Sequence, residues 1–147
     1  MSMSLVHIVA IVSTALALAP AAAHVMELPN KIRLPEAEYL VVQKLYRGWQ
    51  FVGIVVVVAL VSTAMLAASE NGASKSFVAA LVAFMCLVGT QVVFWVFTFP
   101  VNRATGNWTK LPSGWIRMRR RWEFSHAASA VLNLVAFVAA VLAGLGP

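Results

Sequence analysis

The sequence predicts an all-α membrane protein: a four-transmembrane-helix up-and-down bundle with an interfacial helix extension before helix 2 and before helix 4. Three observations predict this fold class. The 147-residue chain is 61% hydrophobic and only 11% charged, which is more apolar surface than one soluble core can hide. Four apolar stretches each approach the roughly 20 residues that a helix needs to cross the hydrocarbon core. All but one of the 11 basic residues fall in two segments between these stretches.

One membrane domain is expected over 1–147, with helices at about 5–24, 36–68, 76–99 and 114–145. The first apolar stretch has no Lys or Arg before it, as a secretory signal would, so a retained helix is favoured over a cleaved leader. Pro29 and Pro35 interrupt the helical pattern, and Pro35 with the acidic residues after it indicates a new helix start. The third helix is expected to stop at Pro100.

The basic residues predict how the chain is oriented. Only Lys75 lies outside the two basic segments, which follow the first and third apolar stretches. The positive-inside rule therefore places both segments in the cytoplasm and both termini on the outer side of the cell's inner membrane. This explains the pI of about 10.3 without nucleic acid. The single Cys86 excludes an intrachain disulfide and a cysteine metal cluster.

Polar and aromatic residues recur at helical spacing on each predicted helix. Polar side chains in hydrocarbon should face the bundle interior, because lipid offers no hydrogen-bond partner. The four stripes are richest at their cytoplasmic ends, which predicts a partly polar pocket there. The alternative is that these residues only glue helices together or anchor them at the interface. The stripes include Tyr46, Gln50, Gln91, Trp95, Thr98, Asn102, Trp115, Trp122, Ser129 and Asn133.

Two histidines and two carboxylates lie at the same predicted depth. His24 and Glu27 leave the first helix, and Glu123 and His126 enter the fourth, each pair three residues apart. Glu-x-x-His on helices is the spacing of di-iron carboxylate bundles, but the second and third apolar stretches supply no further carboxylate. No metal site is therefore expected, and the alternative set is His24, Glu27, Glu123 and His126. An acid-base or hydrogen-bonding role for the histidines is favoured.

These residues together resemble the anthrone-oxygenase-like family of small four-helix membrane proteins, of which this chain is most similar to the bacterial branch. The resemblance covers essentially the whole chain and is most specific from Phe99 to His126. The residues that carry it are His24, Glu27, Pro29, Phe99, Pro100, Val101, Asn102, Asn107, Trp108, Pro112, Trp115, Arg121, Trp122, Glu123 and His126.

The resemblance implies oxidation of an anthrone to an anthraquinone by molecular oxygen, with no cofactor. A positioned base and oxyanion donors in an aromatic slot suffice for such chemistry. His126 or His24 is the expected catalytic base. The expected substrate-binding residues are Asn102, Trp95, Gln91, Thr98, Trp108, Trp115, Trp122, Tyr46 and Gln50.

The expected partners are membrane lipid and a hydrophobic aromatic small molecule, and no nucleic acid. A homo-oligomer or a larger membrane complex stays open. Two alternatives to the enzyme therefore remain: a non-catalytic accessory subunit of a membrane complex, and a protein that binds a small molecule or lipid. A pocket filled by the protein's own side chains would favour the accessory subunit.

Overall fold

The computed structural model describes residues 4–72 and 74–145. Its helices are α1 (Leu5–Lys31), α2 (Glu36–Gln43), α3 (Val52–Ser69), α4 (Lys75–Val93), α5 (Phe99–Thr105) and α6 (Trp115–Leu145). Two 3-10 turns, η1 (Lys44–Tyr46) and η2 (Trp49–Phe51), join α2 to α3, and a π-helical turn, η3 (Phe94–Thr98), joins α4 to α5. Residues 4–72 and 74–145 contain no strand, and the predicted all-α class is confirmed.

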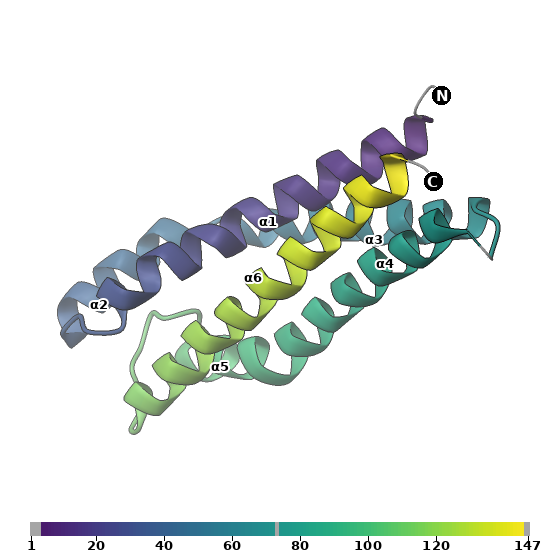
Figure 1. Ribbon diagram of the computed structural model, residues 1–147. Coiled ribbons are helices and arrows are strands. Elements are labelled where there is room, and N and C mark those ends of the chain that lie inside the picture. The colour runs from purple at the N-terminus through teal and green to yellow at the C-terminus, as the bar shows by residue number, and fades with distance from the viewer. Residues whose placement is uncertain (1–3, 73, 146–147) are drawn as a thin grey trace.

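The long helices form a closed ring of four. Helix α6 packs against α1 and α4, and α3 packs against the same two helices from the other side. Figure 1 shows both termini at the end where α3 turns into α4, with α2 and α5 at the opposite end. Four runs are long and apolar enough to cross a membrane: Leu5–Lys31, Trp49–Ser69, Lys75–Thr105 and Trp115–Leu145. The up-and-down bundle, with its first and last spans as neighbours, is therefore confirmed.

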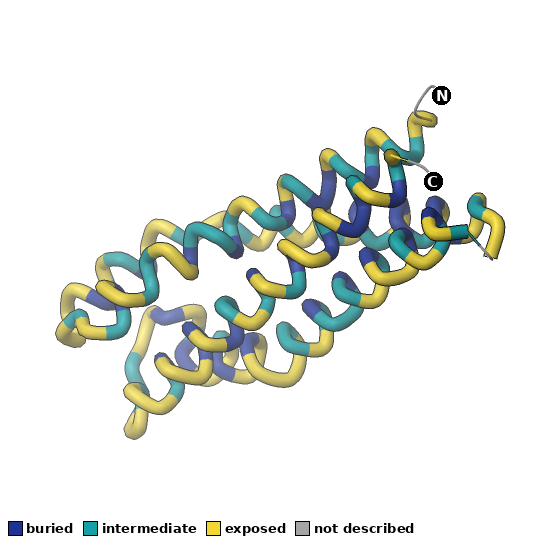
Figure 2. Tube along the Cα trace, in the orientation of Figure 1, coloured by how far each residue is buried: buried dark blue, intermediate teal, exposed yellow. Residues whose placement is uncertain are grey.

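The bundle interior is built from small residues, which let the helices approach closely. Fully buried alanines include Ala10, Ala59 and Ala136. Large apolar side chains such as Leu16 and Leu134 are more than half exposed on the outer faces, the yellow bands along each helix in Figure 2. An apolar exterior over a small-residue core is what contact with lipid requires.

Three of the predicted helix bounds are wrong on the side opposite the termini. Helix α1 does not end near residue 24 but continues through Pro29 to Lys31. An interior proline disfavours a helix locally, and the contacts of Lys31 with Glu123 and Tyr46 offset that cost in the last turn. The helix predicted over 36–68 is broken, since Gly48 has a φ of 91°, a left-handed conformation that ends the helical path. The interfacial extension is thus a separate helix, α2.

The third span passes through Pro100 instead of stopping there. Proline cannot donate to the carbonyl four residues earlier, which is that of Val96. The π-helical turn loosens this part of the helix, and the Arg121 guanidinium donates to the Val96 carbonyl in place of the missing backbone N–H. The helix then runs to Thr105, and α6 begins at Trp115, one residue later than predicted.

Candidate functional site

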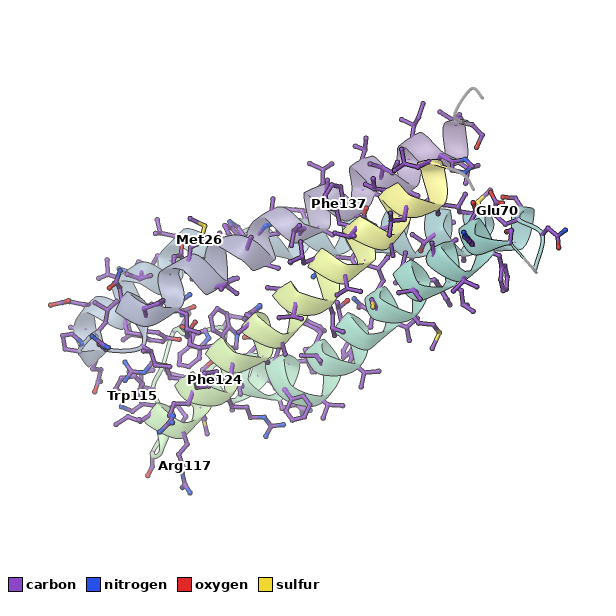
Figure 3. The ribbon with its side chains drawn as sticks, viewed as in Figure 1. Met26, Glu70, Trp115, Arg117, Phe124 and Phe137 are labelled. Atoms are coloured by element: carbon purple, nitrogen blue, oxygen red, sulfur yellow. The ribbon has the colours of Figure 1, made fainter. Side chains whose placement is uncertain are left out.

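The candidate site lies at the end of the bundle opposite the termini. There the last two turns of α1 face the second and third turns of α6, and η1 closes over them. The continuation of α1 past Pro29 is what creates the site, because it places His24, Glu27 and Lys31 at i, i+3 and i+7 on one face. Figure 3 shows Trp115 and Arg117 at this end and Glu70 at the other.

Lys31 is at the centre of a charged cluster of five residues: Lys31, Glu27, Glu123, Tyr39 and Tyr46. The Lys31 side chain is 2% exposed, and its Nζ lies 3.2 Å from Oε2 of Glu123 and 3.3 Å from Oε2 of Glu27. Nζ also lies 2.9 Å from the Tyr46 hydroxyl, which itself donates to Glu27. A buried ammonium is stable only with such partners, so the cluster ties α1, η1 and α6 together.

Glu123 is the most deeply buried carboxylate of the cluster, with a side chain that is 0% exposed. Its Oε1 accepts a 2.9 Å hydrogen bond from the hydroxyl of Tyr39, which is itself fully buried. Above them the Arg119 guanidinium lies 5.3 Å from the Tyr39 ring centre and 4.7 Å from that of Trp115. Arg119 also donates to the Leu34 carbonyl at 2.7 Å, which fixes the turn before α2.

Both tyrosines of the cluster are held in their neutral form. Burial, followed by the Glu123 charge and hydrogen bond, raises the pKa of Tyr39 above its ordinary value. Burial, followed by the hydrogen bond to Glu27, likewise raises the pKa of Tyr46. The two phenols therefore act as hydrogen-bond donors to carboxylates.

The two predicted catalytic histidines are in direct contact. The rings of His24 and His126 stack with centroids 4.2 Å apart and an interplanar angle of 22°. The Trp122 ring packs in a T-shaped arrangement against each of them, with ring centroids 5.1 Å apart for His24 and 4.2 Å apart for His126. The Tyr46 ring also packs against His24, with ring centroids 4.6 Å apart. The histidine pair is thus enclosed by aromatic rings.

The two histidines differ in what their nitrogens contact. Nδ1 of His24 lies 3.1 Å from the Lys31 Nζ. An ammonium only donates, so Nδ1 must be the acceptor, and a neutral His24 ring then carries its hydrogen on Nε2. In His126 the Nε2 atom is buried and has no hydrogen-bond partner among the described residues. A buried polar atom without a partner is costly, and a ligand that bonds it would lower that cost. The Trp108 indole nitrogen, in the same ring cluster, is also buried without a partner among the described residues.

The segment after α5 positions Trp108 beside Trp122. Asn107 and Trp108 have positive φ values of 55° and 61°, which fold the chain back so that the Asn107 N–H donates to the Asn102 carbonyl. The Trp108 ring is buried 5.1 Å from Tyr39 and 5.8 Å from Trp122. The Asn102 side-chain carbonyl accepts a 2.8 Å hydrogen bond from the Trp122 indole, which orients that ring toward the histidines.

The structure brings together some of the predicted substrate-binding residues and not others. Tyr46, Trp108, Trp115 and Trp122 join the ring cluster around the site, and Asn102 orients Trp122. Trp95 is 58% exposed on the outer surface, because the π-helical turn breaks the spacing assumed for its stripe. The others are in separate places: Gln91 bonds Thr90, Thr98 bonds Ser125 at 2.8 Å, and Gln50 is exposed.

Among the described residues, no group of three or more His, Cys, Asp or Glu could hold a metal ion. In the alternative metal set, the Lys31 ammonium occupies the space between Glu27, Glu123 and His24. Two shallow grooves, of about 480 and 210 Å³, flank α5, and neither histidine lines them. Rings of Tyr46, Trp49 and Trp122 pack against the histidine pair, and His126 is half-buried.

Sequence patterns alone missed Lys31 and Tyr39. Lys31 lies beyond the predicted end of the first helix, near residue 24, so the sequence pattern indicates only a basic residue of the segment that follows. Its spacing of four from Glu27 and seven from His24 is the signal that could have found it. Tyr39 lies in the predicted interfacial extension before helix 2, and no sequence pattern indicates its carboxylate partner 84 residues away. Comparison with protein-family models, curated proteins and solved structures gives no match.

Proposed function

We propose that this multi-pass membrane protein is a cofactor-independent oxygenase of lipophilic aromatic substrates, with His126 as its base. The observation that carries the proposal is the buried, unpartnered Nε2 of His126 inside a wall of aromatic rings. The resemblance to the anthrone-oxygenase-like family supplies the reaction type. The protein is proposed to lie in the inner membrane with both termini outside, as the positive-inside rule favours.

The reaction balances without a further reductant. Nε2 of His126 takes a proton from the activated CH₂ of the anthrone, and the resulting carbanion adds molecular oxygen to form a peroxide. Loss of the second hydrogen of that carbon with cleavage of the O–O bond gives the quinone carbonyl and one water. Oxygen is reduced, the CH₂ carbon is oxidised, and the proton on His126 leaves with the water.

The other residues have distinct roles in this proposal. The Nε2 hydrogen of His24, fixed there by Lys31, donates to the developing enolate oxygen. Trp122 offers a flat apolar surface for the substrate and holds its orientation through Asn102. Lys31, Glu27 and Glu123 balance charge around the histidines. Substrate entry requires η1 and η2 to move, since Tyr46 and Trp49 both cover His24.

The test is oxygen uptake and quinone formation from anthrone by the purified protein in liposomes. His126→Ala should abolish turnover with the bundle still helical, and His24→Ala should reduce it strongly. A matched control is His7→Ala, because His7 pairs with Glu70 at the opposite end of the bundle. Unchanged turnover in both His126→Ala and His24→Ala would contradict the proposal.

The second candidate is a non-catalytic accessory subunit of a larger membrane complex. It is favoured by one observation: the protein's own rings and Lys31 are in direct contact with the histidines. Native mass spectrometry of the protein extracted from its own membrane separates the two candidates. A subunit copurifies with stoichiometric protein partners, whereas the enzyme emerges without them and turns over anthrone.

A further inference from the structure

Two grooves flank α5, and both are lined by apolar and basic residues. The larger is lined by Phe99, Pro100, Arg103, Ala104 and Lys110. The smaller shares Pro100 and Ala104 with it, so the two adjoin across the helix. The other residues of the smaller groove are Val101, Arg117, Met118 and Arg121.

Each groove combines an apolar wall with two basic side chains. Arg103 and Lys110 belong to the larger groove, and Arg117 and Arg121 to the smaller; all four are exposed. None of them forms an ion pair with a residue that the structure describes. Glu123, the carboxylate nearest in sequence, does not neutralise them, because it is turned inward toward Tyr39 and Lys31. The grooves therefore carry positive charge that the protein itself leaves unbalanced.

The position of the grooves along the third span also bears on what they bind. They lie at the end of the span Lys75–Thr105, where apolar surface gives way to the basic segment. Next to the smaller groove, in the preceding turn Phe94–Thr98, Phe97 and Val96 are 45% and 48% exposed. Arg121 links the two regions, because its guanidinium lies 5.4 Å from the Phe97 ring centre and donates to the Val96 carbonyl. An occupant thus meets cations at one end and apolar side chains at the other.

We propose that these grooves bind an anionic phospholipid, with its phosphate between Arg103 and Lys110 and its acyl chains along Phe97 and Val96. Basic pockets at the membrane surface beside spanning helices take lipid phosphates in this way, and a phosphate supplies the missing negative charge. The apolar side chains Phe97 and Val96 would contact acyl chains, which favours a lipid over a soluble anion. The site is independent of the histidine pair and of the proposed oxygenase reaction.

Lipid retention by the detergent-solubilised protein in native mass spectrometry tests the proposal. The probes are phosphatidylglycerol and phosphatidylcholine with identical acyl chains, and phosphatidylglycerol should bind at least about tenfold more tightly. The double variant Arg103→Gln/Lys110→Gln should lose about 10- to 30-fold in phosphatidylglycerol affinity. Equal retention of the two lipids by the unmodified protein would overturn the proposal.

A matched control removes the same charge at the same end of the bundle. Arg33→Gln/Lys44→Gln neutralises two exposed basic residues outside the grooves and should change affinity less than about threefold. Equal losses in the two double variants would overturn the proposal, because the affinity would then reflect total charge. Displacement of the lipid by inorganic phosphate alone would overturn the assignment to a lipid.

A third variant guards against misfolding. Arg103→Lys/Lys110→Arg keeps both charges in the larger groove and should retain phosphatidylglycerol within about threefold. Circular dichroism confirms that each variant keeps its helices. Loss of the lipid from this charge-conserving variant, with its helices intact, would contradict a site that recognises a phosphate by charge.

Discussion

Replacing Lys31 by methionine is the sharpest perturbation of this fold. Methionine keeps the length and apolar stem of lysine but removes the ammonium that compensates Glu123. The Glu123 side chain is 0% exposed, so its carboxylate would be left buried with only the Tyr39 hydroxyl as a partner. Removing one partner of a buried ion pair costs about 3–5 kcal/mol. We expect Lys31→Met to lose that much of the free energy of unfolding.

The second partner of Lys31 provides the comparison. The Glu27 side chain is 41% exposed, and water replaces a lost cation there, so Glu27→Gln should cost less than about 1 kcal/mol. Glutamine also keeps an oxygen that accepts from the Tyr46 hydroxyl. The same ammonium thus makes one strong and one weak contribution, and the difference arises from burial alone.

The assay is reversible unfolding in mixed micelles with increasing denaturing detergent, followed by the helical circular dichroism signal. The compensated variant Lys31→Met/Glu123→Gln should recover about 2 kcal/mol of the loss, because no charge remains buried without a partner. A loss below about 1 kcal/mol in Lys31→Met alone, equal to that of Glu27→Gln, would refute the buried ion pair. The ammonium would then reach water.

Two further predictions concern the same end of the bundle. Tyr39 and Tyr46 are the only tyrosines, and their raised pKa values mean that the folded protein should show no tyrosinate absorbance at pH about 10, where an ordinary phenol is half-ionised. Above that pH the unfolded chain binds fewer protons than the folded one, so stability should fall as pH rises. Ordinary titration of both tyrosines in the folded protein would contradict their buried hydrogen bonds to Glu123 and Glu27. Asn102→Ala should lose about 1–3 kcal/mol of the free energy of unfolding, since it leaves the buried Trp122 indole N–H without an acceptor. Asn102→Asp keeps an acceptor and should lose less. Equal losses of the two variants in thermal unfolding would argue against this bond.

The architecture of the bundle could be predicted because it follows from hydropathy and connection length. Four apolar runs separated by short polar segments leave few alternatives to an up-and-down bundle, and the ring of contacts confirms it. The ends of the helices were harder. Pro29 and Pro100 both occur within helical runs. At Pro100 the π-helical turn and the Arg121 guanidinium compensate for the missing donor, whereas at Pro29 the contacts of Lys31 with Glu123 and Tyr46 offset the local cost. No single-sequence pattern says which proline will be tolerated.

Part of the site could be predicted from helical spacing. His24 and His126 were placed at one depth by their spacing on the first and last spans, and the structure stacks them. Lys31 lay beyond the assumed end of the first helix, so its role could not be inferred. Trp95 was assigned to an inward stripe by α-helical spacing, which the turn Phe94–Thr98 does not keep. Whether the histidines are catalytic stays a prediction.

The charged cluster also has a consequence for how the chain is made. Lys31 and Glu27 are on the first span, but the carboxylate that compensates the buried ammonium, Glu123, is on the last. Ribosomes release the N-terminal helices first, so Lys31 enters the membrane surface about 90 residues before its partner exists. Until α6 arrives, that lysine keeps its charge in water, and this end of α1 stays undocked. The last span therefore completes the docking of the first, and a chain truncated before α6 keeps Lys31 with Glu27 but without Glu123, its buried partner.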